Sequence, residues 1–430
     1  MRIHALATDY DETLAMHGRL EETTLAALKR LRDSGRKPLL VTGRNLDDLL
    51  AVCPAIDVFE RVVTDNGAVL YRPETKETKL LAEPPPPQFF ELLAARGCTP
   101  LDRGQVIVAT REPYQTVVIE AIRELGLELQ IIFNKGAVMI LPSGVNKETG
   151  LRAAVAELSL SPHEVVAIGD GENDHAFLSV CECGVAVANG LPMLKQHADL
   201  VTRGAAHEGV IELIEMVLRD DLAMARALPR HDVLLGHALE GGREVRIAPR
   251  AGNVLVTGAS PPERVALVSA FVERLCEAGY QLCLIDPEGA HRALKGVVHL
   301  GTRERAPTLD EATKVLENPD EQLVLTLVGL PEAERPRFLE SFRARLHKLR
   351  AQTGRPHRVI VEQAERLISS SWNLEATVFV TEHEGRLPAS LRDAIEVAIT
   401  VGPTPGTATL TRPRAEAAPV QLAVLRPTKA

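Results

Sequence analysis

The first fifteen residues, Met1-Arg-Ile-His-Ala-Leu-Ala-Thr-Asp-Tyr-Asp-Glu-Thr-Leu-Ala15, decide the fold of the N-terminal half. The apolar run Ile3–Thr8 has the length of a buried strand and ends at Asp9. A helix with leucines at helical spacing is predicted over Glu21–Asp33, and the next strand over Pro38–Thr42. Strands that alternate with helices form a parallel sheet covered on both faces, and ligands bind beyond the carboxyl ends of its strands. The end of each strand is therefore expected at one functional edge.

The same alternation predicts an α/β core that is interrupted once. The interruption begins at Glu83-Pro-Pro-Pro-Pro87, a stiff segment that continues neither a helix nor a central strand. From there to residue 143 the pattern changes to that of a small α+β insert. The further predicted helices are 46–52, 88–96, 114–125, one from 147 and 208–227, and the further strands are 61–64, 105–110, 128–134, 137–142, 165–169 and one near 184–188.

A second α/β unit is predicted after a linker that contains a short hairpin. It begins with the strand Asn253–Thr257, the helix Pro262–Ala278 and the strand Gln281–Ile285, and further strands are expected at 322–327, 358–361 and 377–380. The tail after Gly402 is rich in Pro and Thr and is expected to be extended or loosely held. The predicted division is a core at 1–82 and 144–228, an insert at 83–143, a linker at 229–248, a second domain at 249–405 and a tail at 406–430.

Composition limits the classes of function. A chain of 430 residues with 45% apolar and 25% charged residues is typical of a folded protein of two or three domains. The net charge is −9, and because residues 231–430 carry 25 residues of each sign, the acidity lies in residues 1–230. Neither nucleic acid nor a membrane is an expected partner, since no polybasic tail and no apolar run of spanning length occurs. Six scattered cysteines without a CxxC pair favour reduced thiols in the cytoplasm.

The first segment whose side chains could take part in catalysis is Asp9-Tyr10-Asp11, directly after the opening strand. Two carboxylates two residues apart repel each other unless a cation shares the site. One can attack phosphorus as a nucleophile while the other moves protons on the leaving and attacking oxygens. The alternative is a pair of solvated loop aspartates.

Three further segments add complementary groups. Thr42-Gly43-Arg44 follows a strand and offers a hydroxyl with turn N–H groups, which suits a phosphate oxygen. Asn146-Lys147 places an ammonium group at a helix start, where it can offset phosphate charge. Gly169-Asp-Gly-Glu-Asn-Asp174 delivers acidic residues and an amide into a glycine turn, a set suited to Mg²⁺. A common turn or a surface lysine is the alternative for the first two of these.

In this order, the four segments resemble the haloacid dehalogenase (HAD) superfamily of phosphohydrolases over residues 1–220. The stretch Asn146–Leu151 and the Gly-Asp-Gly-Glu-Asn-Asp run are similar to the Cof-type (IIB) branch, which contains sugar-phosphate, sucrose-phosphate and phosphoglycolate phosphatases. The resemblance implies a Rossmann-like core with a small βαββ cap at 83–143. It implies a Mg²⁺-dependent phosphatase that acts on a small phosphorylated metabolite.

The resemblance also implies roles for individual residues. Asp9 would be the nucleophile, would form an aspartyl-phosphate and would bind Mg²⁺. Asp11 would be the general acid and base, with its backbone carbonyl on the metal. Thr42, Gly43 and Lys147 would bind the transferring phosphoryl group.

The remaining implied roles concern the metal and the frame of the phosphate site. Asp170 would ligate Mg²⁺ directly, and Asn173 and Asp174 would support it through water or hydrogen bonds. Asn66 and Gly67 match a loop that helps to frame the phosphate.

Two neighbouring positions stand apart from this set. Arg44 is expected near the site, and an ordinary salt bridge is its expected role. Glu12 stands where the family usually has Gly, and its side chain would add negative charge beside the metal.

The C-terminal half contains an altered phosphate-binding loop. Residues 254–265 have the strand, loop and helix layout, but the GxxxxGK[ST] pattern is broken by Glu263 and Arg264, although Gly258 is present. This region resembles DNA-pumping P-loop ATPases. In that resemblance, Glu362 matches the acidic residue at the end of their acidic strand. We expect a degenerate nucleotide loop that does not hydrolyse ATP.

Three hypotheses follow. The first is the metabolite phosphatase with a structural or regulatory C-terminal domain. The second is a sensing or scaffold protein that binds a phosphorylated ligand and meets a protein partner through its C-terminal domain. The third is a nucleotide-dependent enzyme linked to nucleic acid.

Overall fold

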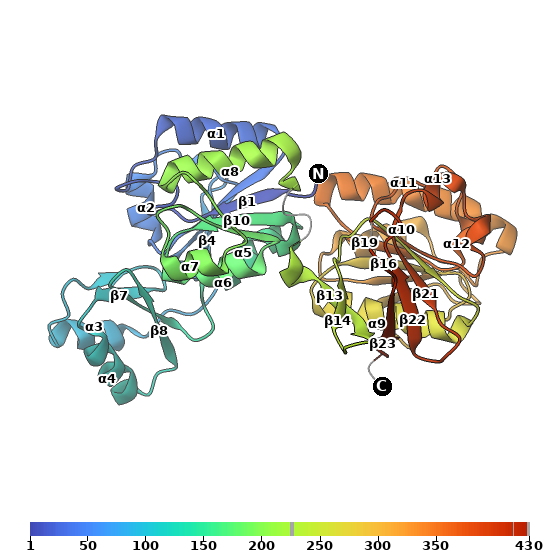
Figure 1. Ribbon diagram of the computed structural model, residues 1–430. Coiled ribbons are helices and arrows are strands. Elements are labelled where there is room, and N and C mark those ends of the chain that lie inside the picture. Colours follow the sequence, from blue (N-terminus) through green and yellow to red (C-terminus); the bar gives the residue numbers. More distant parts are fainter. Residues whose placement is uncertain (224–227, 416, 428–430) are drawn as a thin grey trace. The chain divides into compact units, whose positions relative to one another are not determined.

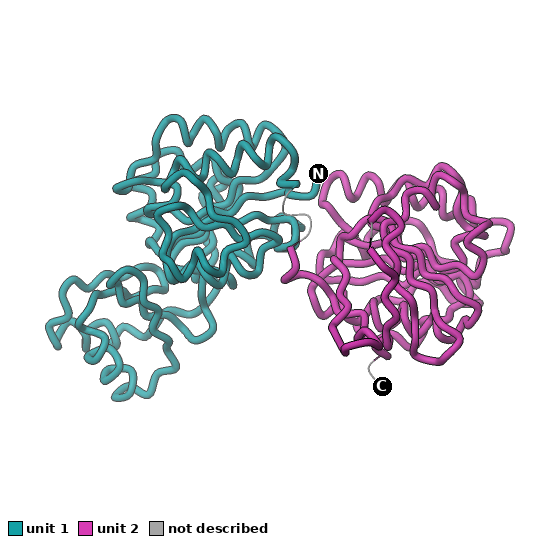
Figure 2. Tube along the Cα trace, in the orientation of Figure 1, with its two compact units in different colours: residues 1–225 teal, residues 226–430 magenta. Residues whose placement is uncertain are grey.

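The structure is a computed structural model that describes residues 1–223, 228–415 and 417–427. The chain divides into two compact units, residues 1–225 and 226–430, which Figure 2 shows in different colours. Each unit has its own central sheet. Among the described helices, none combines the length and the apolar character that crossing a bilayer requires.

A sheet of eight strands, counted over the described residues, is the centre of the first unit, in the order β12-β11-β10-β1-β2-β3-β4-β5. Its strands run parallel as far as β3, and β4 and β5 are added antiparallel. Thr8 at the end of β1 pairs with Ile168 of β10 and Leu40 of β2, so the carboxyl ends of these strands share one edge. The strands are β1 (Ala5–Thr8), β2 (Lys37–Val41), β3 (Arg61–Thr64), β4 (Val69–Arg72), β5 (Glu77–Leu80), β10 (Val165–Gly169), β11 (Cys183–Ala186) and β12 (Leu200–Val201).

Helices cover both faces of this sheet: α1 packs beside α8 on one face, and α5 beside α6 on the other (Figure 1). The start of α5 is fixed by Asn146, whose side chain accepts a hydrogen bond from the Thr149 N–H while the Thr149 hydroxyl accepts one in return. Lys147 is therefore the first residue of that helix. The helices are α1 (Glu22–Asp33), α2 (Leu46–Val52), α5 (Lys147–Glu157), α6 (His175–Val180), α7 (Pro192–His197) and α8 (Ala206–Asp220), with short 3-10 turns η1 (Ile56–Val58), η2 (Asp65–Gly67), η3 (Pro162–Glu164) and η4 (Glu172–Asp174).

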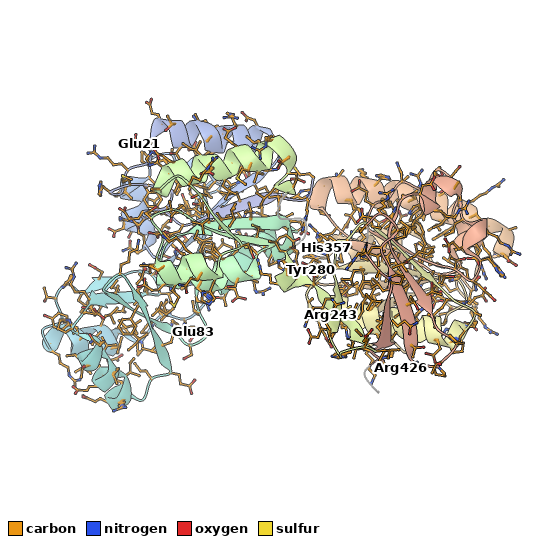
Figure 3. All side chains as sticks on the ribbon, viewed as in Figure 1. Glu21, Glu83, Arg243, Tyr280, His357 and Arg426 are labelled. Carbon is orange, nitrogen blue, oxygen red and sulfur yellow. The ribbon has the colours of Figure 1, made fainter. Side chains whose placement is uncertain are left out.

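The insert forms its own antiparallel sheet with the described order β6-β7-β9-β8, against which two helices pack (Figure 1). Glu83, labelled in Figure 3, lies where the chain leaves the core for the insert. Asp65 of η2 connects the two, because its Oδ2 accepts hydrogen bonds from the backbone N–H groups of Val106 at 2.7 Å and Ile107 at 3.1 Å. The elements are α3 (Pro87–Ala95), β6 (Asp102–Arg103), β7 (Val108–Arg111), α4 (Gln115–Leu125), β8 (Leu129–Asn134) and β9 (Ala137–Pro142).

The described part of the second unit contains an eleven-stranded sheet in the order β14-β13-β23-β22-β21-β15-β20-β19-β16-β18-β17. The strands from β21 to β17 are parallel, and those from β14 to β22 are antiparallel. The strands are β13 (Val233–Ala238), β14 (Glu244–Ile247), β15 (Asn253–Thr257), β16 (Leu282–Asp286), β17 (Val298–Leu300), β18 (Leu323–Thr326), β19 (Arg358–Val361), β20 (Thr377–Val380), β21 (Ile395–Val401), β22 (Thr407–Thr411) and β23 (Val420–Val424). The helices are α9 (Pro261–Glu277), α10 (Leu309–Glu317), α11 (Arg335–Thr353), α12 (Ala364–Leu367) and α13 (Ala389–Arg392), with 3-10 turns η6 (Pro229–His231), η7 (Glu332–Glu334) and η8 (Glu384–Arg386).

The hairpin predicted in the linker is present as β13 and β14, but β13 also pairs with β23, so the hairpin belongs to the second sheet rather than to a linker. The tail expected to be extended or loosely held forms β22 and β23 of the same sheet. The strands β4 and β5 of the first sheet were not predicted. The tail hides its strand signal because Pro and Thr dominate its composition, whereas Leu410 and Leu422 are buried in the core. The helix expected to reach residue 227 ends at Asp220, since Asp221 is left-handed; residues 224–227 lie outside the described residues.

The position of β23 predicts that the tail stabilises the second unit. Leu422→Ala should lower the free energy of unfolding by about 2–5 kcal/mol, because Leu422 is fully buried between β13 and β22. The fluorescence of Trp372, the single tryptophan of the chain, reports unfolding of this unit in a denaturant titration. The exposed neighbour Gln421→Ala should change the free energy by less than about 0.5 kcal/mol. Equal, small effects of both substitutions would contradict this packing.

Candidate active site

Three carboxylates meet at the shared edge of β1 and β10. Asp9 follows β1, Asp170 follows β10, and Asp174 ends η4; all three are buried. One carboxylate oxygen of each lies within 4.8 Å of those of the other two. The parallel register of β1 and β10 brings them together, because both chains leave the sheet at the same level.

The ammonium group of Lys147 neutralises part of the negative charge of these carboxylates. Its Nζ donates hydrogen bonds to Asp9 Oδ1 at 2.6 Å and to Asp174 Oδ1 at 2.5 Å, and the side chain is 1% exposed. The ammonium group also lies 5.6 Å from the ring centroid of Phe177. A buried ammonium group needs such partners, because an unpaired charge in the interior costs several kcal/mol.

Backbone N–H groups hold Asp174 in place. Its Oδ2 accepts hydrogen bonds from the N–H groups of Asp170 and Gly171, both at 2.8 Å. A Cβ at Gly169 would lie 2.6 Å from the Asp174 carboxylate, so only glycine fits there. The Gly-Asp-Gly-Glu-Asn-Asp segment is thus a tight loop that folds around the carboxylate of its own last residue.

Burial and mutual repulsion alter the acidity of the cluster. Burial raises the pKa of Asp9 to about 7; the charge of Lys147 opposes this rise and Asp174 adds to it. Burial also raises the pKa of Asp170, against a hydrogen bond from Lys135. For Lys147 burial acts in the opposite sense, but the charges of Asp174 and Asp9 outweigh it and the pKa lies above its ordinary value.

The donor set fits a magnesium ion. Mg²⁺ prefers hard oxygen ligands, and the cluster of Asp9, Asp170 and Asp174 offers three carboxylates within one small volume. Burial, with a smaller contribution from the neighbouring carboxylates, raises the pKa of Asp9 and Asp170, and a bound divalent cation would favour their ionised forms.

The other predicted phosphate-binding residues lie around one loop. Thr42 follows β2, and its backbone carbonyl accepts a hydrogen bond from the Asn66 N–H at 3.1 Å. Asn173 Nδ2 donates to Asn66 Oδ1 at 2.8 Å, which connects this loop to the aspartate loop. Gly67 has φ +111°, and a Cβ there would lie 1.9 Å from the carbonyl oxygen of Asn146. A Cβ at Gly43 would lie 2.9 Å from Met139 Cε of the insert.

Asp11 is engaged by Arg44 rather than by the cluster. The guanidinium donates from Nε to Asp11 Oδ2 at 2.7 Å and from Nη2 to Oδ1 at 2.8 Å, and the Asp11 side chain is 43% exposed. Glu12 has φ +58°, a left-handed conformation that glycine adopts freely. Its carboxylate lies 3.8 Å from His17 Nδ1.

One site residue was missed by the sequence reasoning. Lys135, at the turn between β8 and β9 of the insert, forms an ion pair with Asp170. Its sequence signal is a Lys-Gly pair between two predicted strands, which marks a hairpin turn but not the direction of its side chain.

The segment predicted to be a degenerate nucleotide loop contacts both its own residues and the C-terminal part of the second unit. Gly258 has φ +132°, and the guanidinium of Arg264 donates to its carbonyl oxygen. Glu263 accepts hydrogen bonds from the Gly406 N–H and from Arg426, which Figure 3 labels.

The acidic strand end of this unit is also engaged. Glu362 follows β19, and its Oε1 lies 2.8 Å from His291 Nε2. The other ring nitrogen of His291 lies 2.9 Å from Ser269 Oγ. Glu362 is therefore held by a buried histidine.

Comparison with known proteins assigns the N-terminal half. The family model described as haloacid dehalogenase-like hydrolase matches residues 6–94 and 104–214. Phosphoglycolate phosphatase of Methanothermobacter thermautotrophicus is 30% identical over 221 residues, which are 49% of this chain and 97% of that protein. The enzyme of the same name from Methanosarcina acetivorans is 28% identical over 222 residues, 50% of this chain and 97% of that protein. A haloacid dehalogenase-like hydrolase of known structure from Bacteroides thetaiotaomicron has 20% identity and a TM-score of 0.43, over 50% of this chain and 99% of that one.

The chain belongs to the haloacid dehalogenase-like hydrolases. This confirms the family and the phosphatase class that the motifs of the N-terminal half predicted. The predicted P-loop character of the second half stays a prediction.

Removal of the buried ammonium group should destabilise the first unit. Lys147→Met should lower the free energy of unfolding by about 3–5 kcal/mol, because it leaves the Asp9 and Asp174 carboxylates without their counter-charge. Denaturant unfolding followed by circular dichroism checks this value. The exposed Lys29→Met on α1 is the control and should change it by less than about 0.5 kcal/mol. A Lys147→Met protein as stable as the unaltered one would show that the carboxylates do not depend on this lysine.

Proposed function

We propose that the chain is a Mg²⁺-dependent phosphatase that hydrolyses a small phosphorylated metabolite through an aspartyl-phosphate on Asp9. The observation that carries the proposal is the buried cluster of Asp9, Asp170 and Asp174 around Lys147. A phosphate monoester carries nearly two negative charges, so an anionic nucleophile approaches it only where cations offset that charge. The cluster combines a nucleophile with the groups that supply this compensation.

In this proposal each residue has a distinct task. Asp9 attacks phosphorus and the ester oxygen leaves, which divides hydrolysis into two displacements. Lys147 holds the Asp9 carboxylate and offsets the phosphoryl charge. The Thr42 hydroxyl, the Gly43 N–H and Asn66 bind the phosphoryl oxygens.

Asp11 moves the protons. It protonates the leaving oxygen in the first displacement and removes a proton from water in the second. Arg44 orients the Asp11 carboxylate through its two hydrogen bonds. Asp11 is positioned by these contacts without being buried among the other carboxylates.

The proposed metal ligands are Asp9, the backbone carbonyl of Asp11, and Asp170, with Asn173 and Asp174 in support. When bound, Mg²⁺ supplies positive charge that neutralises the phosphate dianion. Asn173 also holds the loop of Asn66 and Gly67, which is proposed to frame the phosphate, through its hydrogen bond to Asn66.

We propose phosphoglycolate or a sugar phosphate as the substrate class. The curated relatives above are named phosphoglycolate phosphatases, and each is covered over 97% of its length. The insert at 83–143, proposed as a cap, is small and leaves room for a compact substrate.

For the second unit we propose a degenerate P-loop domain that does not hydrolyse ATP. The supporting observations are the contacts of Arg264 with Gly258 and of Glu362 with His291, which occupy the groups that a nucleotide would need.

Replacement of the nucleophile tests the reaction directly. Asp9→Asn should lower phosphate release from 2-phosphoglycolate by at least about 1,000-fold, because an amide does not attack phosphorus. A malachite-green assay with Mg²⁺ measures the released phosphate. Asp33→Asn, at the exposed end of α1, should retain the activity of the unaltered protein. Turnover that survives Asp9→Asn would exclude Asp9 as the nucleophile.

Asp11→Asn separates the two displacements. Turnover should fall by about 10²–10⁴-fold, because both proton transfers lose their acid and base. With a substrate that has an acidic leaving group, such as p-nitrophenyl phosphate, release of the phenolate should persist as a single burst, since that group leaves unprotonated. Stopped-flow absorbance measures the burst. An equal loss for both substrates, without a burst, would contradict the assigned role.

A further inference from the structure

The hairpin turn between β8 and β9 brings a cation from the insert to the carboxylate cluster. The ammonium group of Lys135 pairs with Asp170, and the Lys135 N–H donates to Glu172 Oε2 at 3.2 Å. The Lys135 side chain is 38% exposed, whereas Asp170 is 4% exposed. Lys135 is therefore the solvent-accessible cation of the cluster, whereas Lys147 is fully buried.

The backbone at this turn does not favour a lysine. Lys135 has φ +49° and Gly136 has φ +83°, between the paired residues Asn134 and Ala137. Two-residue turns with two positive φ values favour Asn, Asp or Gly at the first position. A non-glycine side chain held in this region costs about 1 kcal/mol or more. The presence of lysine at this position therefore indicates that its side chain makes a contact that compensates for the unfavourable backbone conformation.

The hairpin is seated against the catalytic loops. A Cβ at Gly171 would lie 2.6 Å from Asn134 Oδ1, so the aspartate loop and the turn are in close contact. A Cβ at Gly43 would lie 2.9 Å from Met139 Cε of β9. If Asp9 attacks phosphorus, the leaving group extends away from Asp9 in line with that attack. The hairpin contacts two of the loops that surround Asp9, at Gly171 and Gly43.

Of the three cations described around the site, Lys135 is the one whose carboxylate partner a bound metal ion would take over. Lys147 is held by two carboxylates inside the core, and Arg44 is held by Asp11 through two hydrogen bonds. Lys135 pairs with Asp170, the residue proposed to ligate Mg²⁺. A cation on Asp170 would take over that carboxylate and release the ammonium group for a second anion.

We propose that Lys135 is a specificity residue that binds a carboxylate on the leaving group of the substrate. The enzyme would thereby prefer phosphomonoesters of hydroxy acids over those of neutral alcohols. This inference rests on the proposed function, because it assumes that the phosphoryl group lies at Asp9. It assigns the recognition of this carboxylate to one residue of the β8–β9 turn, Lys135.

The test compares two phosphonates of the same length that cannot be hydrolysed. Binding of 3-phosphonopropionate and of propylphosphonate is measured by calorimetry in the presence of Mg²⁺; only the first has a carboxylate. The unaltered protein should bind 3-phosphonopropionate about 10-fold more tightly or better, as expected for a hydrogen-bonded charge pair. Lys135→Asn should remove this preference and leave propylphosphonate affinity within about 3-fold.

The variants control for misfolding. Asn suits the left-handed turn and offsets part of the loss of the ion pair with the buried Asp170, so Lys135→Asn should remain folded, with the circular dichroism spectrum of the unaltered protein. Lys135→Arg should retain most of the preference because it keeps the charge. Lys76→Asn replaces an exposed lysine with φ +58° in the turn between β4 and β5, and it should bind both ligands as the unaltered protein does.

Each remaining outcome is decisive. An unchanged preference in Lys135→Asn, or an equal loss of affinity for both ligands, would overturn the role of Lys135 while propylphosphonate binding to the unaltered protein still supports the phosphate site. If the unaltered protein bound neither ligand, the proposed function would be contradicted and the inference would fall with it.

Discussion

The ion pairs of Lys147 with Asp9 and Asp174 are the interaction on which the first unit depends. A fully buried ammonium group between two carboxylates holds the ends of β1, η4 and α5 at one point. The capped start of α5 fixes where the lysine lies, and the aspartate loop fixes where its partner lies. The charge of Lys147 opposes the rise in the Asp9 pKa that burial causes, so it favours the ionised form of the carboxylate that is proposed as the nucleophile.

The acidic residues around the Lys147 ion pairs differ in their exposure to solvent. Arg44 holds Asp11 at the rim, where proton exchange with solvent is possible, whereas Asp174 is fully buried. The insert contributes its β8–β9 hairpin, which contacts the aspartate loop through Asn134 and Lys135. The core therefore supplies the carboxylate cluster, and the insert adds a cation that pairs with one member of that cluster, Asp170.

Local signals in the sequence predicted the parallel core well, and long-range contacts limited the rest. The strands Arg61–Thr64 and Val165–Gly169 are as predicted. The second is a continuous apolar run before a glycine turn, which marks a buried parallel strand. The motif residues Asp9 and Asp170 follow strands, so their meeting at one edge could be inferred. The contact of Lys135 with Asp170 depends on how the insert folds back, which no local pattern encodes. Pairing of β23 in the second sheet is similarly non-local and was hidden by a proline-rich segment.

Mass spectrometry of the acid-quenched enzyme during turnover tests the central claim most directly. The protein is mixed with 2-phosphoglycolate and Mg²⁺, quenched in acid within milliseconds to seconds, digested at low pH and mapped. The account predicts one added phosphoryl group on the peptide that contains Asp9, at the Asp9 carboxylate, and its disappearance once substrate is exhausted. Turnover with no phosphorylated peptide, or with the group on another residue, would contradict it.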